Sequence, residues 1–467
     1  MLLTRREFML HAGQGCIGYA LGAAAFAAGV HRFGAVNLLA QGNDYKALVC
    51  VFLAGGNDGN NVVVPLGTTE YNAYASVRSA SGLAIARDSL LPITPVSINS
   101  PFGLHPSLAE LHDLWSRQKL AIVCNAGPLV QPISRQDYLG GAPRPYQLFS
   151  HSDQIAQWQT SIADRIGQTG WGGRTADRFA PLNSGLPMVT ALAGGIFTRG
   201  QATTPLSIAS APTALNQLLV VNGFGTAADE TARKNAMDAL RTMDTDPAMV
   251  AAASRTTQQA IDIGQAFNTD VTLATAFPNT TLGNQLKQVA KVIKFNSAST
   301  TLGANRQIFF CQLGGFDTHQ NQVGTQSTLL TQVSQGIKAF HDATVELGLD
   351  DKITTFTLSD FGRTFQPAGS GNAAGSDHAW GNHHLVVGGA VQGGDFFGVA
   401  GPDSTVFPVL QLGGPSDTDT RGRWIPTVSV EQYAATLASW YGVAESDLPI
   451  VFPNIGRFER STLGFMV

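Results

Sequence analysis

Five short apolar runs constrain the fold of this chain more than any other feature of its sequence. Each run is six to eight residues long, is rich in apolar or β-branched residues, and ends in or is followed by Gly or Ser. Continuous apolar runs of this length are typical of strands that are buried on both faces of a parallel sheet. We therefore predict an α/β fold with a mostly parallel central sheet flanked by helices. The runs cover residues 47–54, 120–126, 306–313, 353–358 and 384–389.

Helical patterns lie between and after these strands. Pro106 opens an amphipathic segment, and further helices are predicted over 327–347 and 429–442. From about 227 to 297 the sequence is rich in Ala, Gln, Lys and Thr and has helical periodicity. We interpret this stretch as a helical cap inserted into one large domain that spans residues 41–467.

The first forty residues have the features of an export signal. Arg5 and Arg6 form a twin-arginine pair, and an apolar stretch of 15 residues follows from Cys16 to Val30. This stretch is shorter than the ~20 residues that span a bilayer. We predict that residues 1–40 are a signal for the Tat translocase, removed on export to the periplasm or beyond, and that no permanent membrane span remains. The alternative is an amphipathic N-terminal helix that stays in place.

The composition argues against several classes of protein. Lys and Arg number 29 and Asp and Glu 33, for a net charge of -4, and no block of basic residues occurs. Nucleic acid is therefore not an expected partner. Charged residues make up 13% of the chain, about half of the usual ~25%, and such a polar but uncharged surface suits an exported protein. The absence of any C-x-x-C pattern argues against a Cys-based metal site.

Carboxylates and imidazoles follow several of the predicted strands. Ligands of open α/β sheets bind at the carboxyl ends of the strands, and Asp oxygen and His nitrogen are common donors to divalent cations. Turn chemistry accounts for any one of these Asp residues but not for the His residues beside them. We therefore predict a metal site at this edge. Its candidates are Asp58, His151, Asp317, His319, Asp360, Asp377, His378, His383 and His384.

Other kinds of site have weaker support. The Gly pairs at 55–56 and 314–315 are not followed by G-x-G-x-x-G or P-loop spacing, which argues against a nucleotide cradle. No G-x-S-x-G or H-E-x-x-H pattern is present, which weakens the α/β-hydrolase and zincin interpretations. His383 and His384 open a strand, so one of the two is expected to point inward and to be structural.

The motifs together resemble a known family. They are RR-E-F at the start, F-L-A-G-G-N-D-G-N-N, L-F-S-H-S-D-Q with G-W-G-G-R, G-G-F-D-T-H, S-D-F-G-R-T and D-H-A-W-G-N-H-H. They are similar to those of the domain-of-unknown-function family 1501, Tat-exported bacterial proteins placed near the sulfatases in the alkaline phosphatase superfamily. The resemblance covers nearly the whole chain after the signal, and it implies an alkaline phosphatase/sulfatase-like fold.

The resemblance also implies a bimetallic esterase. Ser150, at the start of a helix running through Trp158, would be the nucleophile, and Arg363 would neutralise charge on a phosphoryl or sulfuryl oxygen. The ions would be divalent, namely zinc, calcium, magnesium or manganese. The implied metal ligands are Asp58, Asp317, His319, Asp360 and His378. His151, Asp377, His383 and His384 are candidates for supporting these ligands or replacing one of them.

The chain departs from the superfamily pattern in ways that leave alternatives open. Phe361 stands where the relatives have His directly after the strand-end Asp, and no C-x-P-x-R sulfatase signature occurs. The first hypothesis is hydrolysis of a phosphate or sulfate ester, on a small molecule or a polymer, by Ser150 or a metal-activated water. The alternative is a non-catalytic metal-containing binding or assembly protein, with Ser150 as a helix cap. A third hypothesis, a carbohydrate-binding surface protein, is supported only by Trp171, Trp380 and the polar composition.

Overall fold

The computed structural model describes residues 44–98, 100–179, 188–219, 225–243, 247–267, 269–298 and 303–467. The chain divides into two units, Met1–Asp44 and Tyr45–Val467, and all the described helices and strands belong to the second unit. The predicted export signal, residues 1–40, lies outside the described residues. No helix in the described part of the chain combines the length and the apolar character that a membrane span requires.

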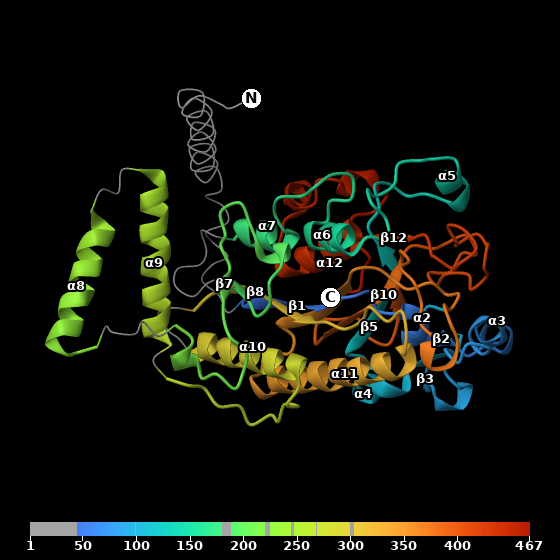
Figure 1. Cartoon of the computed structure of the whole chain (residues 1–467), viewed down its shortest axis with the longest axis horizontal. Coiled ribbons are helices and arrows are strands. Elements are labelled where there is room, and N and C mark those ends of the chain that lie inside the picture. Colours follow the sequence, from blue (N-terminus) through green and yellow to red (C-terminus); the bar gives the residue numbers. More distant parts are fainter. Residues whose placement is uncertain are drawn as a thin grey trace. The chain divides into compact units, whose positions relative to one another are not determined.

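The described chain alternates strands with helices (Figure 1). The strands are β1 Lys46–Leu53, β2 Val63–Pro65, β3 Leu91–Ile93, β4 Phe102–Leu104, β5 Leu120–Gly127, β6 Val189–Ala191, β7 Leu206–Ser207, β8 Arg306–Leu313, β9 Ile353–Ser359, β10 Asn382–Gly388, β11 Phe396–Phe397 and β12 Val428–Ser429. The α-helices are α2 Gly59–Val62, α3 Thr68–Arg78, α4 Ala109–Ser116, α5 Arg135–Leu139, α6 His151–Thr160, α7 Trp171–Asp177, α8 Ala228–Thr242, α9 Ala248–Ala266, α10 Thr281–Ala298, α11 Gln322–Glu346, α12 Val430–Tyr441 and α13 Leu448–Val451.

The central sheet has the order β11-β5-β10-β9-β1-β8-β6-β7, with β12 also paired to β5. β1 lies in the middle and pairs in parallel with both β8 and β9. β10 is antiparallel to β9 and to β5. The predicted α/β fold with a mostly parallel central sheet is therefore confirmed. The reversed direction of β10 was not predicted, because an apolar run carries no information about strand direction.

The register of the middle strands places their ends level with one another. Leu53, the last residue of β1, pairs with Leu313 of β8 and with Ser359 of β9. The loops that leave these three strands therefore start side by side at the carboxyl edge of the sheet. In open α/β folds this edge is where ligands bind.

Helices cover both faces of the sheet (Figure 1). Successive residues of β1 belong to opposite sides, because side chains alternate along a strand. Val49 and Val51 join the core cluster that includes residues of α4, α10 and α11. Leu48 and Cys50 join the cluster that includes residues of α6, α7 and α12. Burial on both faces is the physical reason why the strands read as continuous apolar runs.

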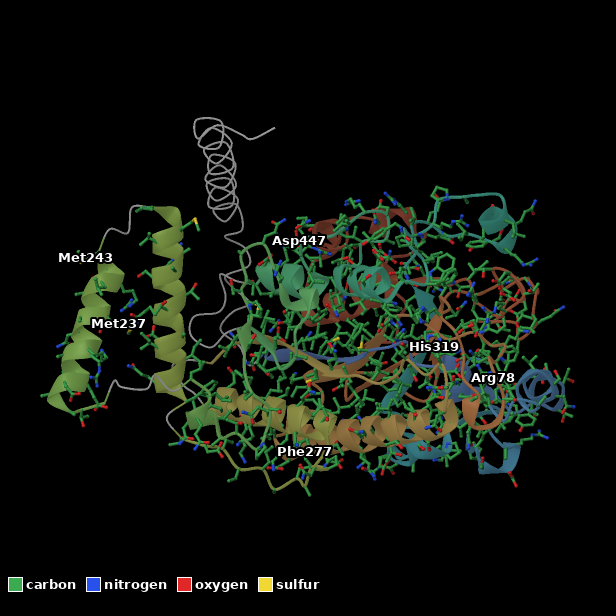
Figure 2. All side chains as sticks on the ribbon, viewed as in Figure 1. Arg78, Met237, Met243, Phe277, His319 and Asp447 are labelled. Atoms are coloured by element: carbon green, nitrogen blue, oxygen red, sulfur yellow. The ribbon has the colours of Figure 1, made fainter. Side chains whose placement is uncertain are left out.

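The segment predicted as a helical insertion, about 227–297, contains three helices. α10 packs on the sheet, with Leu286 and Val289 fully buried in the core cluster below β8. α8 and α9 are connected by a hydrogen bond of 2.8 Å from Ser254 Oγ to the carbonyl of Arg241. No residue of α8 is buried, and Figure 2, in which Met237 of this helix is labelled, shows its side chains. α10 thus belongs to the layer that covers the sheet.

Candidate metal centre

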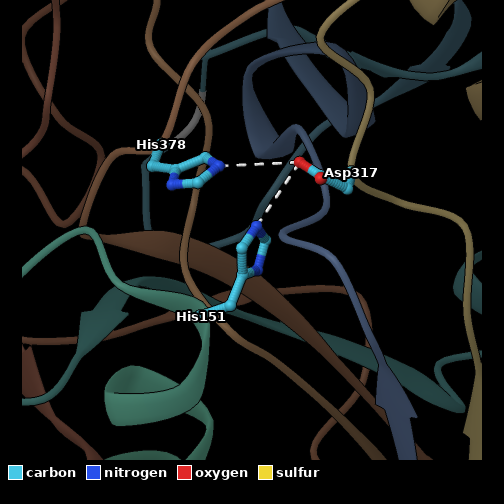
Figure 3. A group of neighbouring side chains, drawn as sticks. All are labelled: His151, Asp317 and His378. Carbon is cyan, nitrogen blue, oxygen red and sulfur yellow. Dashed lines mark ion pairs between the residues drawn. The ribbon is translucent and has the colours of Figure 1, made fainter.

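Four segments bring ionisable side chains to the carboxyl edge of the sheet. Asp317 and His319 lie in the loop after β8, and Asp360 follows β9 directly. His151 is the first residue of α6, and His378 comes from the loop before β10, where it forms an antiparallel bridge with Arg363. The side chains of His151, Asp317 and His378 point toward one another (Figure 3) and form a group able to hold a metal ion.

One oxygen of Asp317 is the centre of this cluster. Its Oδ1 lies 3.4 Å from Nε2 of His151, 3.1 Å from Nε2 of His319 and 3.6 Å from Nε2 of His378. The Nε2 atoms of His319 and His378 are 2.9 Å apart. The side chains of Asp317 and His319 are 49% and 44% exposed. We call this cluster of His151, Asp317, His319 and His378 the His-Asp centre.

The other nitrogen of each imidazole is bound to an acceptor. Nδ1 of His151 lies 2.7 Å from Oδ2 of Asp360, and Nδ1 of His319 lies 3.1 Å from Oδ1 of Asp377. Nδ1 of His378 lies 2.7 Å from the carbonyl oxygen of Phe149. A carboxylate or carbonyl oxygen only accepts, so each Nδ1 donates its proton. In a neutral imidazole this leaves a lone pair on Nε2, facing Asp317.

The converging atoms fit a divalent cation. One donor atom from each of His151, Asp317 and His378 lies within 4.8 Å of the others, and converging lone pairs of this kind favour a cation between them. The buried Nε2 of His151 also has no hydrogen-bond partner among the described residues. Imidazoles held through Nδ1 by a carboxylate or carbonyl are the usual arrangement around zinc. Two nitrogens and the carboxylate oxygen supply three ligands of a tetrahedral site, and His319, whose Nε2 lies 3.1 Å from that oxygen, is the candidate for the fourth.

The surroundings shift the pKa values of these groups. The hydrogen bond to Asp360 raises the pKa of His151, and burial lowers the pKa of His378. Partial burial alone would raise the pKa of Asp317, but the hydrogen bond and charge of Arg363 outweigh it and lower that pKa below its usual value. Asp317 is therefore ionised at neutral pH, and His378 offers a neutral nitrogen.

Phe361 forms an aromatic wall against the centre. Its side chain is fully buried, and its ring centroid lies 4.6 Å from that of His378 and 4.7 Å from that of His151. The residue that replaces the His of the superfamily pattern thus packs on two imidazoles and restricts their rotation. It supplies no ligand of its own.

Arg363 is fully occupied by the protein itself. Its side chain is 0% exposed and contacts Oδ1 of Asp317 at 2.5 Å. The guanidinium also donates to four backbone carbonyls, those of Gly55, Gly56, Phe316 and Ser376. Arg363 therefore joins the loops after β1, β8 and β9 and orients Asp317. The structure does not place it where it meets a substrate oxygen.

Asp58 does not join the His-Asp centre. Its carboxylate lies 2.6 Å from Nη1 of Arg78, and both side chains are 0% exposed. Asn60 and Gln322 donate to the same carboxylate. Both oxygens are thus bound to groups of the chain, and the cation that offsets Asp58 is Arg78 (labelled in Figure 2). Nothing in the sequence pointed to Arg78, because α3 reads as an ordinary surface helix.

Asp360 and Asp377 lie one step outside the centre. Asp360 is 1% exposed; its Oδ1 accepts from the backbone of Gly55 at 2.9 Å, and its Oδ2 holds His151. Asp377 bonds His319 through one oxygen and Arg421 through the other. The sequence analysis gave Asp360 as a metal ligand and His151 as a residue that supports a ligand. In the structure the two arrangements are exchanged: His151 faces Asp317, and Asp360 holds His151 from behind.

His383 and His384 are core residues of β10. Burial lowers their pKa values to about 4 and about 3. His383 stacks on Phe407 with centroids 4.7 Å apart, and His384 packs on Trp158 at 4.5 Å. Since Phe407 and Trp158 belong to the two different core clusters, the imidazoles occupy opposite faces of the sheet. Both are structural in this arrangement.

Ser150 is the residue before α6, next to the centre. Its Oγ donates to Oδ2 of Asp153 at 2.5 Å and makes no cap bond to the helix backbone. Gln147 and Phe149, just before it, have φ values of 47° and 71°. Left-handed conformations are uncommon for such residues and cluster at functional sites. This turn brings the start of α6, with Ser150 and His151, to the edge of the sheet.

Comparisons with known proteins place the chain in a family. Residues 45–406 match the family described as "Protein of unknown function (DUF1501)", and the chain belongs to it. No curated protein matches the sequence.

The solved structures that match this chain share little sequence with it. The C-terminal periplasmic domain of EcEptC from Escherichia coli, in complex with Zn, is 10% identical, covers 74% of each chain and has a TM-score of 0.33. The PsFucS1 sulfatase from Pseudoalteromonas sp. is 8% identical over 77% of this chain and 66% of its own, with a TM-score of 0.31. A putative sulfatase from Bacteroides thetaiotaomicron is 9% identical over 90% and 76%, with a TM-score of 0.30.

Proposed function

We propose that this member of the DUF1501 family is an exported metal-dependent hydrolase of phosphate or sulfate esters, on a small molecule or a polymer, and that the His-Asp centre is its metal site. One observation carries the proposal. Three imidazoles are held through Nδ1 by Asp360, Asp377 and the carbonyl of Phe149, and their Nε2 atoms converge on one oxygen of Asp317.

The donor set favours zinc among the divalent ions. His151, His319 and His378 offer nitrogen and Asp317 offers oxygen, whereas calcium and magnesium prefer oxygen ligands throughout. A bound divalent ion supplies Lewis acidity, polarising an ester oxygen and offsetting the charge that develops on it. Asp58, bound to Arg78, is not part of the proposed ligand set.

The charges around the centre suit an anionic substrate. Asp317 pairs with Arg363 and Asp377 with Arg421, so each of these carboxylates is offset by a guanidinium. Asp360 pairs with His151. A divalent ion at the His-Asp centre adds two positive charges, which attract the phosphate or sulfate of an ester.

Ser150 is the proposed nucleophile. Its hydroxyl already donates to Asp153 at 2.5 Å, so that carboxylate is positioned to take the proton as Oγ attacks phosphorus or sulfur. Ser150 precedes the first turn of α6, where unpaired backbone amides favour an anion. The new bond joins Oγ to the central atom as the bond to the leaving oxygen breaks, and the proton taken by Asp153 passes to that oxygen, so that a neutral alcohol departs. Water then hydrolyses the ester on Ser150, which releases phosphate or sulfate and restores the hydroxyl.

The test combines metal analysis with turnover. The mature protein is expected to contain one ion per chain and to hydrolyse generic phosphomonoester, phosphodiester or sulfate ester substrates. Asp317→Ala is expected to lose the ion and all turnover. Ser150→Ala is expected to keep the ion and lose turnover by a factor of roughly 10³ or more. An Asp317→Ala variant with full metal content would contradict the proposal.

Ser152 provides a matched control for Ser150. Its Oγ also approaches Oδ2 of Asp153, at 3.3 Å, and lies 3.2 Å from Oγ of Ser150. Ser152→Ala therefore removes a hydroxyl from the same hydrogen-bonded group and is expected to retain most of the turnover. Equal losses in both variants would argue that the serines support the turn rather than the reaction.

A metal-containing binding protein without turnover is the second candidate. Phe361 favours it, because this residue closes one side of the centre where a further ligand would be needed for a second ion. This candidate predicts tight retention of one ion and no hydrolysis of any ester class. The same experiment separates the two, since only the hydrolase loses a measurable activity in Ser150→Ala.

Export by the Tat translocase is part of the proposal. Arg5 and Arg6 precede the apolar stretch of residues 16–30, and exchange of both for Lys is expected to leave the protein in the cytoplasm. Fractionation of cells that express the two forms measures this. Periplasmic protein from the double variant would contradict the assignment of the route.

A further inference from the structure

We propose that Arg423 binds the anionic group of the substrate beside the His-Asp centre, so that the site recognises a tetrahedral oxyanion through one guanidinium as well as through the ion. The part of this inference that concerns ester hydrolysis rests on the proposed function. The binding of an anion by Arg423 does not depend on it. It also reassigns the role that the sequence suggested for Arg363, whose guanidinium is fully bound within the protein.

Arg423 is attached to the two segments that hold His378. Its Nε donates to the backbone carbonyl of His378 at 3.0 Å. Its guanidinium lies over the ring of Phe149, 4.3 Å from the centroid, and the carbonyl of Phe149 is the acceptor for Nδ1 of His378. Arg423 and the metal-ligand candidate His378 are therefore bonded to each other through the main chain, and both also contact Phe149.

Arg423 keeps donors that the protein does not use. Its Nη1 approaches Oδ2 of Asp419 at 3.2 Å, and its side chain is 20% exposed. Its Nη2 has no hydrogen-bond partner among the described residues. Arg363, in contrast, is 0% exposed and bonds five acceptors. Near the centre, Arg423 thus combines a fixed position with free N–H groups.

The start of α6 favours an anion at the same place. Phe149, which stacks against Arg423, is followed by Ser150 and by the first turn of the helix. The free amides of a helix N-terminus attract negative charge. Arg423 and this turn are therefore two independent sources of positive potential on one side of the His-Asp centre.

The chemistry of Arg423 matches phosphate and sulfate esters. A guanidinium presents planar, paired donors that suit the oxygens of a tetrahedral anion, and stacking on an aromatic ring holds the plane in place before the ligand arrives. Arg423 transfers no proton in the proposed reaction. Its role is to bind and orient the ester, which affects KM and the affinity for product more than the chemical step.

The test measures binding of inorganic phosphate and sulfate to the metal-loaded mature protein by calorimetry. Arg423→Gln is expected to weaken both anions by about tenfold to a hundredfold, because a charge-assisted hydrogen bond is lost. Arg423→Lys keeps the charge but not the planar fork, and an intermediate loss is expected. Metal content is expected to stay at its wild-type value, while the unfolding midpoint is expected to fall because the hydrogen bond to His378 and the contact with Phe149 are lost.

Arg117 provides the matched control. It also pairs with a single carboxylate, that of Asp113 at 3.1 Å, and it precedes β5 at the opposite edge of the sheet. Arg117→Gln removes the same charge from the molecule and is expected to leave anion affinity unchanged within about twofold, since an exposed charge at that distance is screened.

Several outcomes overturn the inference. They are wild-type phosphate affinity in Arg423→Gln, loss of the metal from that variant, and absence of phosphate binding by the wild-type protein. Hydrolysis of esters with an unchanged KM in Arg423→Gln would overturn this inference and leave the proposed function intact. Phosphate binding that depends on Arg423, in a protein that hydrolyses no ester, would support this inference and contradict the proposed function.

Discussion

The loops after β1 and β8 carry the same Gly-Gly-x-Asp pattern, in Gly55–Asp58 and Gly314–Asp317, but their carboxylates have opposite surroundings. Asp58 is 0% exposed and paired with Arg78, whereas Asp317 is 49% exposed and faces three imidazoles. The strands are in register at Leu53 and Leu313. Asp58 lies five positions beyond its strand and Asp317 four, so the two side chains leave the edge differently.

This difference teaches which carboxylates are available to an ion. Asp58 receives a guanidinium and side-chain amides, so its charge is offset before any ion arrives. Asp317 receives one guanidinium, that of Arg363, and its remaining neighbours offer lone pairs. The first carboxylate stabilises the fold around α3, and the second is the one that needs a cation.

Breaking the buried pair tests the first half of this comparison and has the largest expected effect. Asp58→Asn leaves the charge of Arg78 buried without its counter-ion, which is expected to cost about 3–5 kcal/mol of stability. Chemical denaturation measures the free energy of unfolding. The folded fraction is expected to retain its metal. A variant of wild-type stability that has lost the ion would place Asp58 in the metal site and refute the contrast with Asp317.

Weakening the support of one imidazole sharpens the second half. Asp377→Asn keeps an oxygen near Nδ1 of His319 but removes the charge that holds it. Metal affinity, measured by competition with a chelator, is expected to fall by about tenfold to a hundredfold. Asp113→Asn, which alters a remote surface pair, is the control. Equal affinity in both variants would mean that His319 does not ligate the ion.

A third carboxylate, that of Glu431 in the first turn of α12, is buried like that of Asp58 but has no guanidinium paired with it among the described residues. It is 0% exposed, and burial raises its pKa to about 8 from an ordinary value of 4.5. The folded state therefore holds a proton that the unfolded state releases, so stability is highest below pH 4.5 and falls until about pH 8. The slope expected from this group is about 1.4 kcal/mol per pH unit.

Glu431→Gln is expected to remove this slope, because the amide does not titrate. The measurement is the free energy of unfolding of both proteins between pH 5 and pH 9, taken as the difference between them to cancel other groups. A constant difference across this range would mean that the pKa of Glu431 is ordinary and that burial does not raise it.

The fold was largely readable from the sequence because its main signal is local. The five apolar runs correspond to β1, β5, β8, β9 and β10, and the segment opened by Pro106 leads into α4. Strand direction was not readable, as β10 demonstrates, because direction follows from how a connection returns to the sheet. The short strands β6, β7, β11 and β12 contain two or three residues each, too few for a periodic pattern.

The site was readable only in part. The strand-end rule brought Asp317, His319 and His378 to one edge, and the structure places them together. The same rule gave Asp58 equal weight, because the partner that decides its role, Arg78, lies 20 residues away on a helix. The same rule gave Asp360 as a ligand and His151 only as a supporting residue. Which of the two faces the centre depends on the hydrogen bond between them, and the sequence does not show that bond.

The sequence by itself determined the family, the parallel α/β architecture and the edge at which polar groups gather, because these depend on local patterns of burial and on residue type. The tertiary structure decided which of those groups remain available. Arg78 takes Asp58, and Arg363 binds the loops and Asp317, while Arg423 keeps free donors beside His378. The physical reason is that a charge acts through its nearest partners, and those partners are set by packing between segments that lie from 20 to more than 300 residues apart in the sequence.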